Sequence, residues 1–167
     1  MPRTVKSLDV ERTDEMAIET ILLAVGPGDA DRARRLAEET VDVAGPTGAT
    51  VVLLHVFTRE EYDETLATLE FDTSASDVSP DEVATRHRTV RSLETAMDDA
   101  GIDFEVRGNV GEHGPGIVEA AEDVAADLVV VGGRRRSPAG KAVFGSTAQE
   151  VMLEAPCPVM FVRADTK

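Results

Sequence analysis

Three hydrophobic runs along the chain are apolar on both faces and rich in β-branched residues. They lie at residues 21–25, 51–56 and 128–131. Runs of this kind are typical of central strands in a parallel sheet that helices cover on both sides. A fourth run, 102–107, alternates apolar and charged residues and predicts a strand with one exposed face at an edge of the sheet. A fifth, Val159 to Val162, follows the helix-stopping Pro156 and predicts the last strand.

Between the predicted strands, apolar residues recur at helical spacing. The first such segment predicts a helix whose buried face is formed by Ala33, Leu36, Ala37, Thr40 and Val41. We expect Gly45 and Pro46 to end this helix. A second, longer helix is predicted from Ser79, whose spacing to Glu82 makes a capping box. Its apolar stripe is formed by Val83, Val90, Leu93 and Met97.

Two further helices are predicted in the C-terminal half. One begins near Gly114 and Pro115 and buries Ile117, Ala120, Ala121 and Val124. The other starts at Ser146, whose spacing to Gln149 predicts another capping box. The acidic segment 60–77 interrupts the alternation of strand and helix, and it predicts a short helix followed by a mobile surface loop.

The order of the predicted elements defines the fold class. Strands that alternate with helices predict parallel βαβ units joined by right-handed crossovers. A chain of 167 residues is long enough for one domain and too short for two ordinary ones. We therefore predict a single doubly wound α/β domain over residues 18–165, with about five mainly parallel strands and helices on both faces. Residues 1–17 are assigned to a polar N-terminal extension.

Charge adds a constraint on environment and partners. The chain has 32 acidic and 17 basic residues, only three of them lysines, and a formal net charge of −15. Such a chain repels nucleic acid, and its surface favours dispersion in a salt-rich cytoplasm such as that of a halophile. An ordinary acidic cytosolic protein is the alternative. The single cysteine, Cys157, fits a reducing cytoplasm, and no apolar run approaches the roughly 20 residues that cross a membrane.

The segment from Gly132 to Thr147 carries the candidate chemistry. Two glycines directly follow a strand, and four of the seventeen basic residues lie within the next eight positions. Gly145-Ser146 then opens a helix. Amides at a helix N-terminus attract anions, glycine lets a ligand approach, and hydroxyls donate to phosphate oxygens. We therefore expect an anionic ligand at the carboxyl ends of the strands. Alternatively, these cations pair with acidic neighbours or with a partner subunit.

These residues resemble the C-terminal signature of the universal stress protein family. The shared features are a strand that ends in glycine, a loop with glycine and cations, Gly145-Ser146 at a helix start, and Cys157-Pro158 before a short strand. ATP-binding members of that family carry G-x2-G-x9-G-S/T, and the similarity extends over most of residues 21–162. The resemblance implies a five-stranded sheet in the order 3-2-1-4-5 and a dimer. It also implies ATP or another adenine nucleotide, with or without magnesium, between strands one and four.

The resemblance also implies a set of nucleotide-binding residues. They are Val25, Gly26, Val56, Gly132, Gly133, Arg135, Gly145, Ser146 and Thr147. Two of them depart from the family pattern: Arg135 replaces the second glycine, and Gly26 stands where ATP-binding members usually have an aspartate. Asp29 and Asp31 are the candidate substitutes for that aspartate.

The sequence thus favours a nucleotide-binding stress-response or regulatory protein without efficient catalysis. No activated nucleophile, general base or P-loop is evident, so at most slow ATP hydrolysis is expected. The alternative, which Gly26 and Arg135 favour, is a dimeric protein-interaction module that has lost the nucleotide. It docks an unknown protein partner through the arginine loop, which carries Arg134, Arg135, Arg136 and Lys141.

Two remaining predictions concern the last strand and the histidines. The apolar strand Val159 to Val162 leaves an edge that proteins usually cover, and it predicts a twofold homodimer through this strand. His55, His87 and His113 lack the spacing of metal ligands, so no metal site is expected. We expect His87 to pack against apolar neighbours and His113 to border the ligand.

Overall fold

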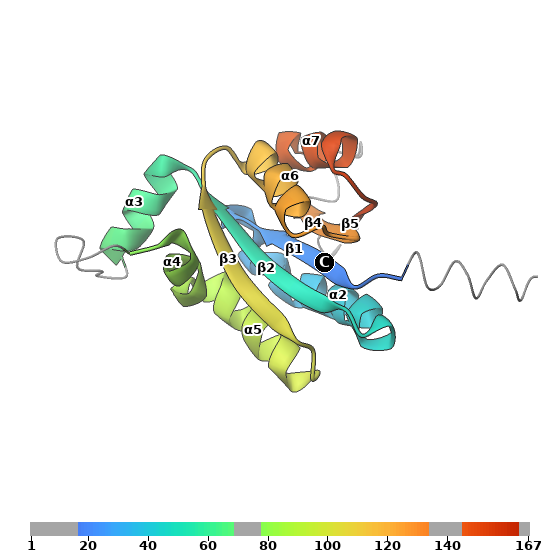
Figure 1. Ribbon diagram of the computed structural model, residues 1–167. Coiled ribbons are helices and arrows are strands. Elements are labelled where there is room, and N and C mark those ends of the chain that lie inside the picture. Colours follow the sequence, from blue (N-terminus) through green and yellow to red (C-terminus); the bar gives the residue numbers. More distant parts are fainter. Residues whose placement is uncertain (1–16, 69–77, 134–144, 164–167) are drawn as a thin grey trace, which may run out of the picture.

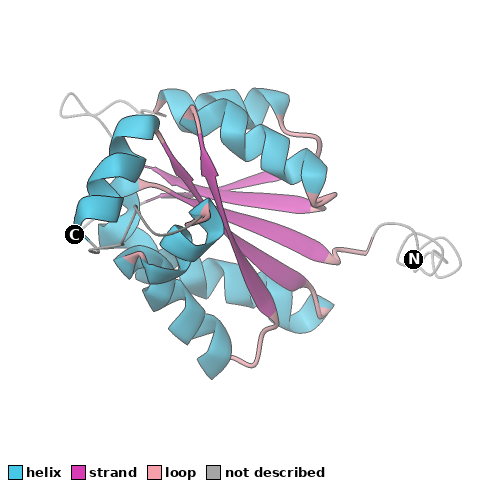
Figure 2. Ribbon diagram, turned by 60° about the vertical axis from the view of Figure 1, so that its left-hand side comes forward, coloured by secondary structure: helices cyan, strands magenta, loops and turns pink. Residues whose placement is uncertain are grey.

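The computed structural model describes residues 17–68, 78–133 and 145–163, which form a central sheet with helices on both faces (Figure 1 and Figure 2). Along the chain the elements are β1 (Thr20–Val25), the 3₁₀ helix η1 (Pro27–Arg32), α2 (Ala33–Thr47), β2 (Thr50–Phe57), α3 (Arg59–Thr68), α4 (Pro80–Arg86), α5 (Arg88–Asp99), β3 (Phe104–Val110), α6 (His113–Asp123), β4 (Leu128–Gly133), α7 (Ser146–Glu154) and β5 (Val159–Arg163). The short helix predicted after residue 60 is α3, and the loop predicted after it, at 69–77, lies outside the described residues.

The five strands pair in the order β3-β2-β1-β4-β5, and every neighbouring pair is parallel. The predicted order 3-2-1-4-5 is therefore confirmed. The three runs that are apolar on both faces form the three inner strands, since Ile21 of β1 lies between Val51 of β2 and Leu128 of β4. The alternating run lies at the edge as predicted, although β3 covers 104–110 and not 102–107.

Helices cover both faces of the sheet (Figure 2), and an apolar cluster lies on each face. On one face, Leu36 of α2 and Leu93 of α5 pack in a cluster with Leu53 of β2. On the other, Ile117 of α6 and Val151 of α7 belong to a second cluster. Neighbouring residues of each inner strand point to opposite faces, so one strand supplies both layers. No helix in the described ranges is both long enough and apolar enough to cross a membrane.

The end of α2 differs from the prediction. The helix continues through Gly45 and Pro46 to Thr47. The residue that stops it is Gly48, whose φ of 71° lies in the left-handed region that glycine adopts without strain. The Gly48 amide donates to the Ala44 carbonyl at 2.9 Å. A proline this close to the end disturbs few helical hydrogen bonds, so it did not mark the boundary.

The long helix predicted from Ser79 is two helices, α4 and α5, which meet at His87. This residue is extended, with φ −70° and ψ 136°. Its amide donates to the Ala84 carbonyl at 3.0 Å, and its Nδ1 accepts a hydrogen bond from the Thr89 amide at 3.3 Å. His87 therefore ends α4 and caps α5, in addition to the packing predicted for it. The capping box at the start of α4 is confirmed, since the Glu82 amide donates to Ser79 Oγ at 3.2 Å.

Candidate functional site

A cleft of about 380 Å³ opens at the carboxyl ends of β1 and β4. From β1 the sheet extends to β2 on one side and to β4 on the other, so the chain order reverses between β1 and β4. In open α/β sheets, ligands bind where the order reverses, because the loops after the two strands part there. The position of the cleft thus follows from the topology.

The predicted site residues that the structure describes all line this cleft. They are Val25, Gly26, Val56, Gly132, Gly133, Gly145, Ser146 and Thr147. Arg135 lies outside the described residues, as do the other cations of the arginine loop. Residues from β1, β2, β4 and the start of α7 therefore meet in one place, although more than 100 positions separate them along the chain.

The start of α7 forms one wall of the cleft. Its N-cap is Gly145, which is extended with φ −61° and ψ 161°, and no side chain caps the helix. The capping box predicted for Ser146 and Gln149 is therefore wrong. The helix starts one residue earlier than a Ser146 cap requires, since the Gly145 carbonyl accepts the Gln149 amide at 3.0 Å. The first amides of a helix lack helical acceptors, so an uncapped N-terminus in a cleft attracts an anion.

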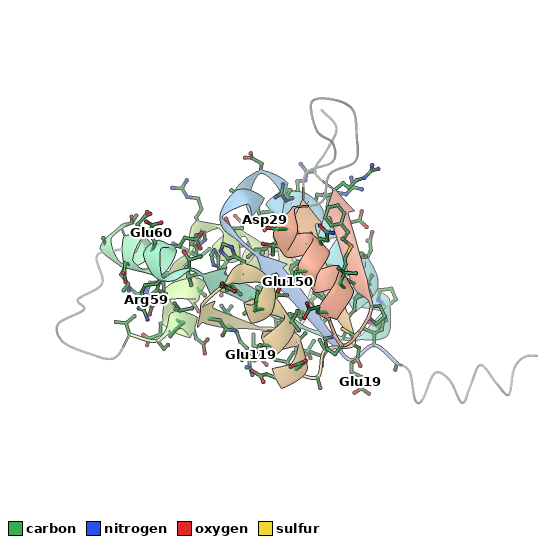
Figure 3. All side chains as sticks on the ribbon, turned by 90° about the horizontal axis from the view of Figure 1, so that it is seen from above. Glu19, Asp29, Arg59, Glu60, Glu119 and Glu150 are labelled. Carbon is green, nitrogen blue, oxygen red and sulfur yellow. The ribbon has the colours of Figure 1, made fainter. Side chains whose placement is uncertain are left out.

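Asp29 and Arg32 of η1 also line the cleft, and Figure 3 labels Asp29. One carboxylate oxygen of Asp29 accepts the Gly26 amide at 2.7 Å, and the other lies 2.5 Å from Arg32 Nε. Both side chains are largely buried, with exposed fractions of 10% and 14%. Of the two aspartates proposed to replace the missing family residue, Asp29 lines the cleft, whereas Asp31 is exposed and lies outside it.

The position of Arg32 also explains why one of the two residues at the end of β4 is glycine. A Cβ atom placed on Gly132 would lie 2.9 Å from Cδ and Nε of Arg32. A Cβ atom on Gly133 would instead lie 2.6 Å from the Phe161 ring of β5. Packing alone therefore favours glycine at both positions. Gly132 additionally leaves room in the cleft for the guanidinium group of Arg32. The backbone amides at the start of α7, which line the same cleft, favour negative charge.

His113 lines the same cleft, as predicted, and is held by α3. Its Nε2 lies 2.8 Å from the Glu61 carboxylate, which also accepts the Thr58 amide at 2.9 Å. Burial opposes ionisation of Glu61, but the hydrogen bonds from Thr58 and His113 outweigh it and lower the pKa of this carboxyl. The pair thus fixes the N-terminus of α6 to α3 at the rim of the cleft.

His55 lies deep beside this region and is only 2% exposed. Its ring stacks on Phe57 with centroids 4.2 Å apart and lies 4.3 Å from the ring of His87. Neither ring nitrogen has a hydrogen-bond partner among the described residues. Burial, followed by the neighbouring His87, lowers the pKa of His55 to about 3, so the ring is neutral at pH 7. The described residues contain no group of three or more side chains suited to a metal.

The sequence model of the universal stress protein family matches residues 17–163. This chain belongs to the universal stress protein family. A universal stress protein of Mycolicibacterium smegmatis is 35% identical over 96 residues, which cover 57% of this chain and 74% of that protein. A solved universal stress protein of Archaeoglobus fulgidus is 27% identical, with a TM-score of 0.59, and the match covers 87% of this chain and 98% of that one.

Several similar universal stress protein structures hold an adenine nucleotide. One from Arabidopsis thaliana has AMP bound; it is 15% identical, with a TM-score of 0.60, and the match covers 89% of this chain and 93% of that one. Two others, at 22% and 23% identity, are complexes with cAMP and with dAMP. At these identities the likeness establishes the shared fold, and the nucleotides belong to those proteins.

Sequence reasoning on this universal stress protein missed Arg32 and Glu61. The spacing of Asp29 and Arg32, three positions apart, is the one signal that pointed to their pairing. For Glu61 no signal existed, because its partner His113 is 52 positions away.

Proposed function

We propose that this universal stress protein binds an adenine nucleotide, such as ATP or AMP, in the cleft between β1 and β4. The observation that carries the proposal is the uncapped N-terminus of α7, which lines a cleft at the point where the strand order reverses. Backbone amides there favour a phosphate group. The AMP, cAMP and dAMP complexes of similar proteins support an adenine nucleotide as the ligand.

Within this proposal the residues divide into a polar and an apolar end. Gly132, Gly145, Ser146 and Thr147 contact the phosphates, with Arg32 as a cation beside them. Val25 and Val56 lie at the ends of β1 and β2, where an aromatic base finds apolar contacts and backbone groups. Arg32 is thus the one arginine among the described residues that line the cleft.

The proposed role is binding and regulation without efficient hydrolysis. Asp29 is the one carboxylate among the described residues that line the cleft, and its two oxygens already engage Gly26 and Arg32. A general base needs a free lone pair within reach of the attacking water. Magnesium, where it accompanies ATP, would be held chiefly by the nucleotide's own phosphates, because Asp29 is occupied.

A protein-interaction module without nucleotide is the second candidate function. It is favoured by Arg32, whose side chain lies close over Gly132 and narrows the cleft where a phosphate would approach. In this case Arg32 and the loop that follows β4 present cations to an acidic partner protein. Nucleotide titration separates the two functions.

We expect AMP and magnesium-ATP to bind with dissociation constants in the micromolar range, measured by isothermal titration calorimetry. Gly145→Ala is expected to weaken both affinities about tenfold, which is roughly 1.4 kcal/mol, since the new methyl group enters the cleft where the phosphates approach. Among the described residues, no heavy atom lies within 4 Å of a Cβ added at Gly145, so their packing tolerates the change. The matched control is Gly45→Ala on α2, where an added Cβ also meets nothing.

Two results contradict this proposal. Equal affinities of Gly145→Ala and the unchanged chain would place the nucleotide away from α7. The absence of binding heat with either nucleotide, at protein concentrations that detect micromolar affinity, would favour the interaction module.

We also propose that the protein is a homodimer formed through β5. This strand is an edge of the sheet, and its residues Val159, Met160 and Phe161 are only half-buried. The Val129 amide donates to the Pro158 carbonyl, so the parallel ladder uses the Met160 amide and leaves the Val159 amide facing away from β4. A second copy of β5 can pair with that free edge.

Light scattering after gel filtration is expected to give twice the chain mass of 17.8 kDa. Val159→Pro is expected to raise the dimer dissociation constant at least tenfold, because it removes an amide on the free edge and not one that bonds β4. Val159→Ala loses similar side-chain contacts but keeps the amide, so it controls for packing. A monomeric unchanged chain, or equal effects of the two variants, would refute pairing through β5.

We place the protein in a salt-rich cytoplasm on the basis of its net charge of −15. Repulsion among carboxylates destabilises the compact state in dilute buffer, and added salt screens it. The thermal unfolding midpoint is therefore expected to rise as potassium chloride increases to about 2 M, where the screening length is below ~3 Å. Maximal stability in dilute buffer would contradict this assignment.

A further inference from the structure

The pair of Asp29 and Arg32 decides whether the cleft between β1 and β4 suits a metal ion beside the nucleotide. Asp29 is the one carboxylate among the described residues that line this cleft. One of its oxygens accepts the Gly26 amide at 2.7 Å, and the other lies 2.5 Å from Arg32 Nε. Donors of the protein itself therefore engage both oxygens.

The carboxylate of Asp29 does not suit magnesium in this arrangement. Mg²⁺ prefers a near-octahedral shell of oxygen ligands and is usually held by one or two carboxylates together with phosphates. An ion bonded to the Asp29 oxygen that faces Arg32 would lie about 2 Å from that oxygen. It would then lie beside the positive charge of the guanidinium group, and repulsion between the two cations opposes this position.

Other carboxylates near the cleft do not replace Asp29. Glu61 is not among the described lining residues, and its Oε1 atom lies 2.8 Å from His113 Nε2 and also accepts the Thr58 amide. Asp31 is exposed and lies outside the cleft lining. The described part of the chain thus offers no second carboxylate in this cleft.

The segment that joins two lining residues, 134–144 between Gly133 and Gly145, lies outside the described residues. Its sequence contains four basic residues and no aspartate or glutamate, so it has no carboxylate for a metal. The segments 69–77 and 164–167 continue from α3 and β5, neither of which lines the cleft. The segment 1–16 precedes the start of β1, at the other end of that strand from Gly26.

Arg32 has the charge and the free donors to meet a phosphate directly. Its side chain is 14% exposed and is fixed through Nε by Asp29. A guanidinium group carries several N–H donors, so its Nη atoms can bond a phosphate while Nε bonds the carboxylate. Gly132 and Gly28 flank this side chain, and an added Cβ would lie 2.9 Å from Nε at Gly132 and 3.5 Å from an Nη atom at Gly28.

We propose that Arg32 replaces a divalent cation at the phosphates, so that this cleft selects metal-free nucleotide over its magnesium complex. Asp29 is the positioning residue that holds the guanidinium group. An ATP molecule that carries magnesium has fewer negative charges for Arg32 and for the amides at the start of α7 to attract. This inference rests on the proposed nucleotide function and names the form of nucleotide that the site takes.

The test is isothermal titration of the full chain with ATP, once with EDTA and once with excess magnesium chloride, at equal ionic strength. AMP under the same two conditions is the control ligand, because a monophosphate holds magnesium only weakly. It reports any effect of magnesium on the acidic protein itself.

The variants separate the charge of Arg32 from its other contacts. Arg32→Gln removes the charge, and Arg32→Lys keeps it. The matched control is Arg34→Gln, which makes the same change in net charge at an exposed ion pair with Glu38, outside the cleft. Circular dichroism establishes that each variant is folded. Where Arg32→Gln is not, Asp29→Asn with Arg32→Gln takes its place, because it leaves no unpaired buried carboxylate.

We expect the unchanged chain to bind metal-free ATP about tenfold more tightly than magnesium-ATP, and magnesium to change the affinity for AMP less than about threefold. Arg32→Lys and Arg34→Gln are expected to keep the tenfold preference. In Arg32→Gln, or in the double variant, it is expected to fall below about threefold, because the cation that attracts the additional phosphate charge is absent.

Three results overturn the inference. Equal or tighter binding of magnesium-ATP by the unchanged chain would reject it and leave the nucleotide function standing. A tenfold preference that persists in Arg32→Gln or the double variant would assign the selection to other cations, and this also rejects the role of Arg32. The absence of binding of both nucleotides under both conditions would refute the nucleotide function and this inference with it.

Discussion

Replacing Gly108 by alanine is expected to lower the free energy of unfolding by about 3 kcal/mol. Gly108 lies in the edge strand β3, directly beneath α4. An added Cβ would collide with the carbonyl oxygen of Pro80, lie 2.6 Å from its carbonyl carbon and lie 3.1 Å from the Ala84 Cβ. Two of these atoms are backbone and cannot rotate away, so α4 must shift as a whole.

A shift of α4 also breaks contacts that hold this end of the fold together. The Gly108 amide donates to the Asp81 carboxylate at 2.7 Å, and α4 supplies Val83 and Ala84 to the apolar cluster around Phe57. Displacement therefore costs both a hydrogen bond to a charged group and apolar burial.

Chemical denaturation of the Gly108→Ala chain measures this loss. The control is Gly45→Ala, where an added Cβ meets nothing and helix propensity favours alanine by up to about 1 kcal/mol. We expect the control to be as stable as the unchanged chain or slightly more so. A Gly108→Ala chain of unchanged stability would show that α4 does not pack on β3 as described.

Acidification from pH 7 to pH 5 is expected to lower the free energy of unfolding by about 2 kcal/mol through His55 alone. Burial, followed by the neighbouring His87, holds the pKa of this ring near 3 in the folded chain, against an ordinary value of 6.5. The unfolded chain therefore binds a proton first as the pH falls. Stability rises with pH between about 3 and 6.5, by roughly 1.4 kcal/mol per unit, and is lost on acidification.

The charged and titratable groups that act on His55 are His87, His113 and Glu61. The Glu61 carboxylate favours the protonated ring, but desolvation outweighs it. The pKa of Glu61 is lowered in the folded chain, so its ionised form stabilises the fold above about pH 4.5, the value for the unfolded chain. This stabilisation is lost only as the pH falls below about 4.5. The interval from pH 7 to pH 5 therefore avoids the loss of stability that is due to Glu61.

The variant that tests this account is His55→Leu. It removes two buried nitrogens that have no partner among the described residues, so stability at pH 7 is expected to be equal or higher. Urea denaturation at pH 7 and pH 5, at constant salt, is expected to show the acid loss in the unchanged chain and about 2 kcal/mol less of it in the variant. Equal losses in both chains would contradict the burial of an unpartnered ring.

The sequence predicted the sheet well because its signals are local. Runs such as 128–131 are buried on both faces, and only central parallel strands meet that requirement. Helix ends were predicted less well because tertiary contacts decide them. The apolar stripe from Val83 to Met97 is continuous, yet the chain bends at His87, and Val83 and Val90 pack in different clusters.

The members of the candidate site were predicted from their motif, but two features of its chemistry were not. The start of α7 at Gly145 leaves the helix without a side-chain cap, whereas the spacing of Ser146 and Gln149 predicts one. The ion pair of Asp29 with Arg32 depends on the 3₁₀ turn of η1, which brings both side chains into the cleft. A short turn after a strand has no strong periodicity, so the spacing of Asp29 and Arg32 was the one sequence signal for this pair.

Amide hydrogen exchange of the full chain with and without AMP tests the central claim, that the cleft between β1 and β4 holds an adenine nucleotide. We expect slower exchange at two separate segments, the start of α7 over residues 145–148 and the end of β1 over residues 25–28, because the ligand contacts both. Unchanged exchange at both segments in the presence of saturating AMP would contradict it.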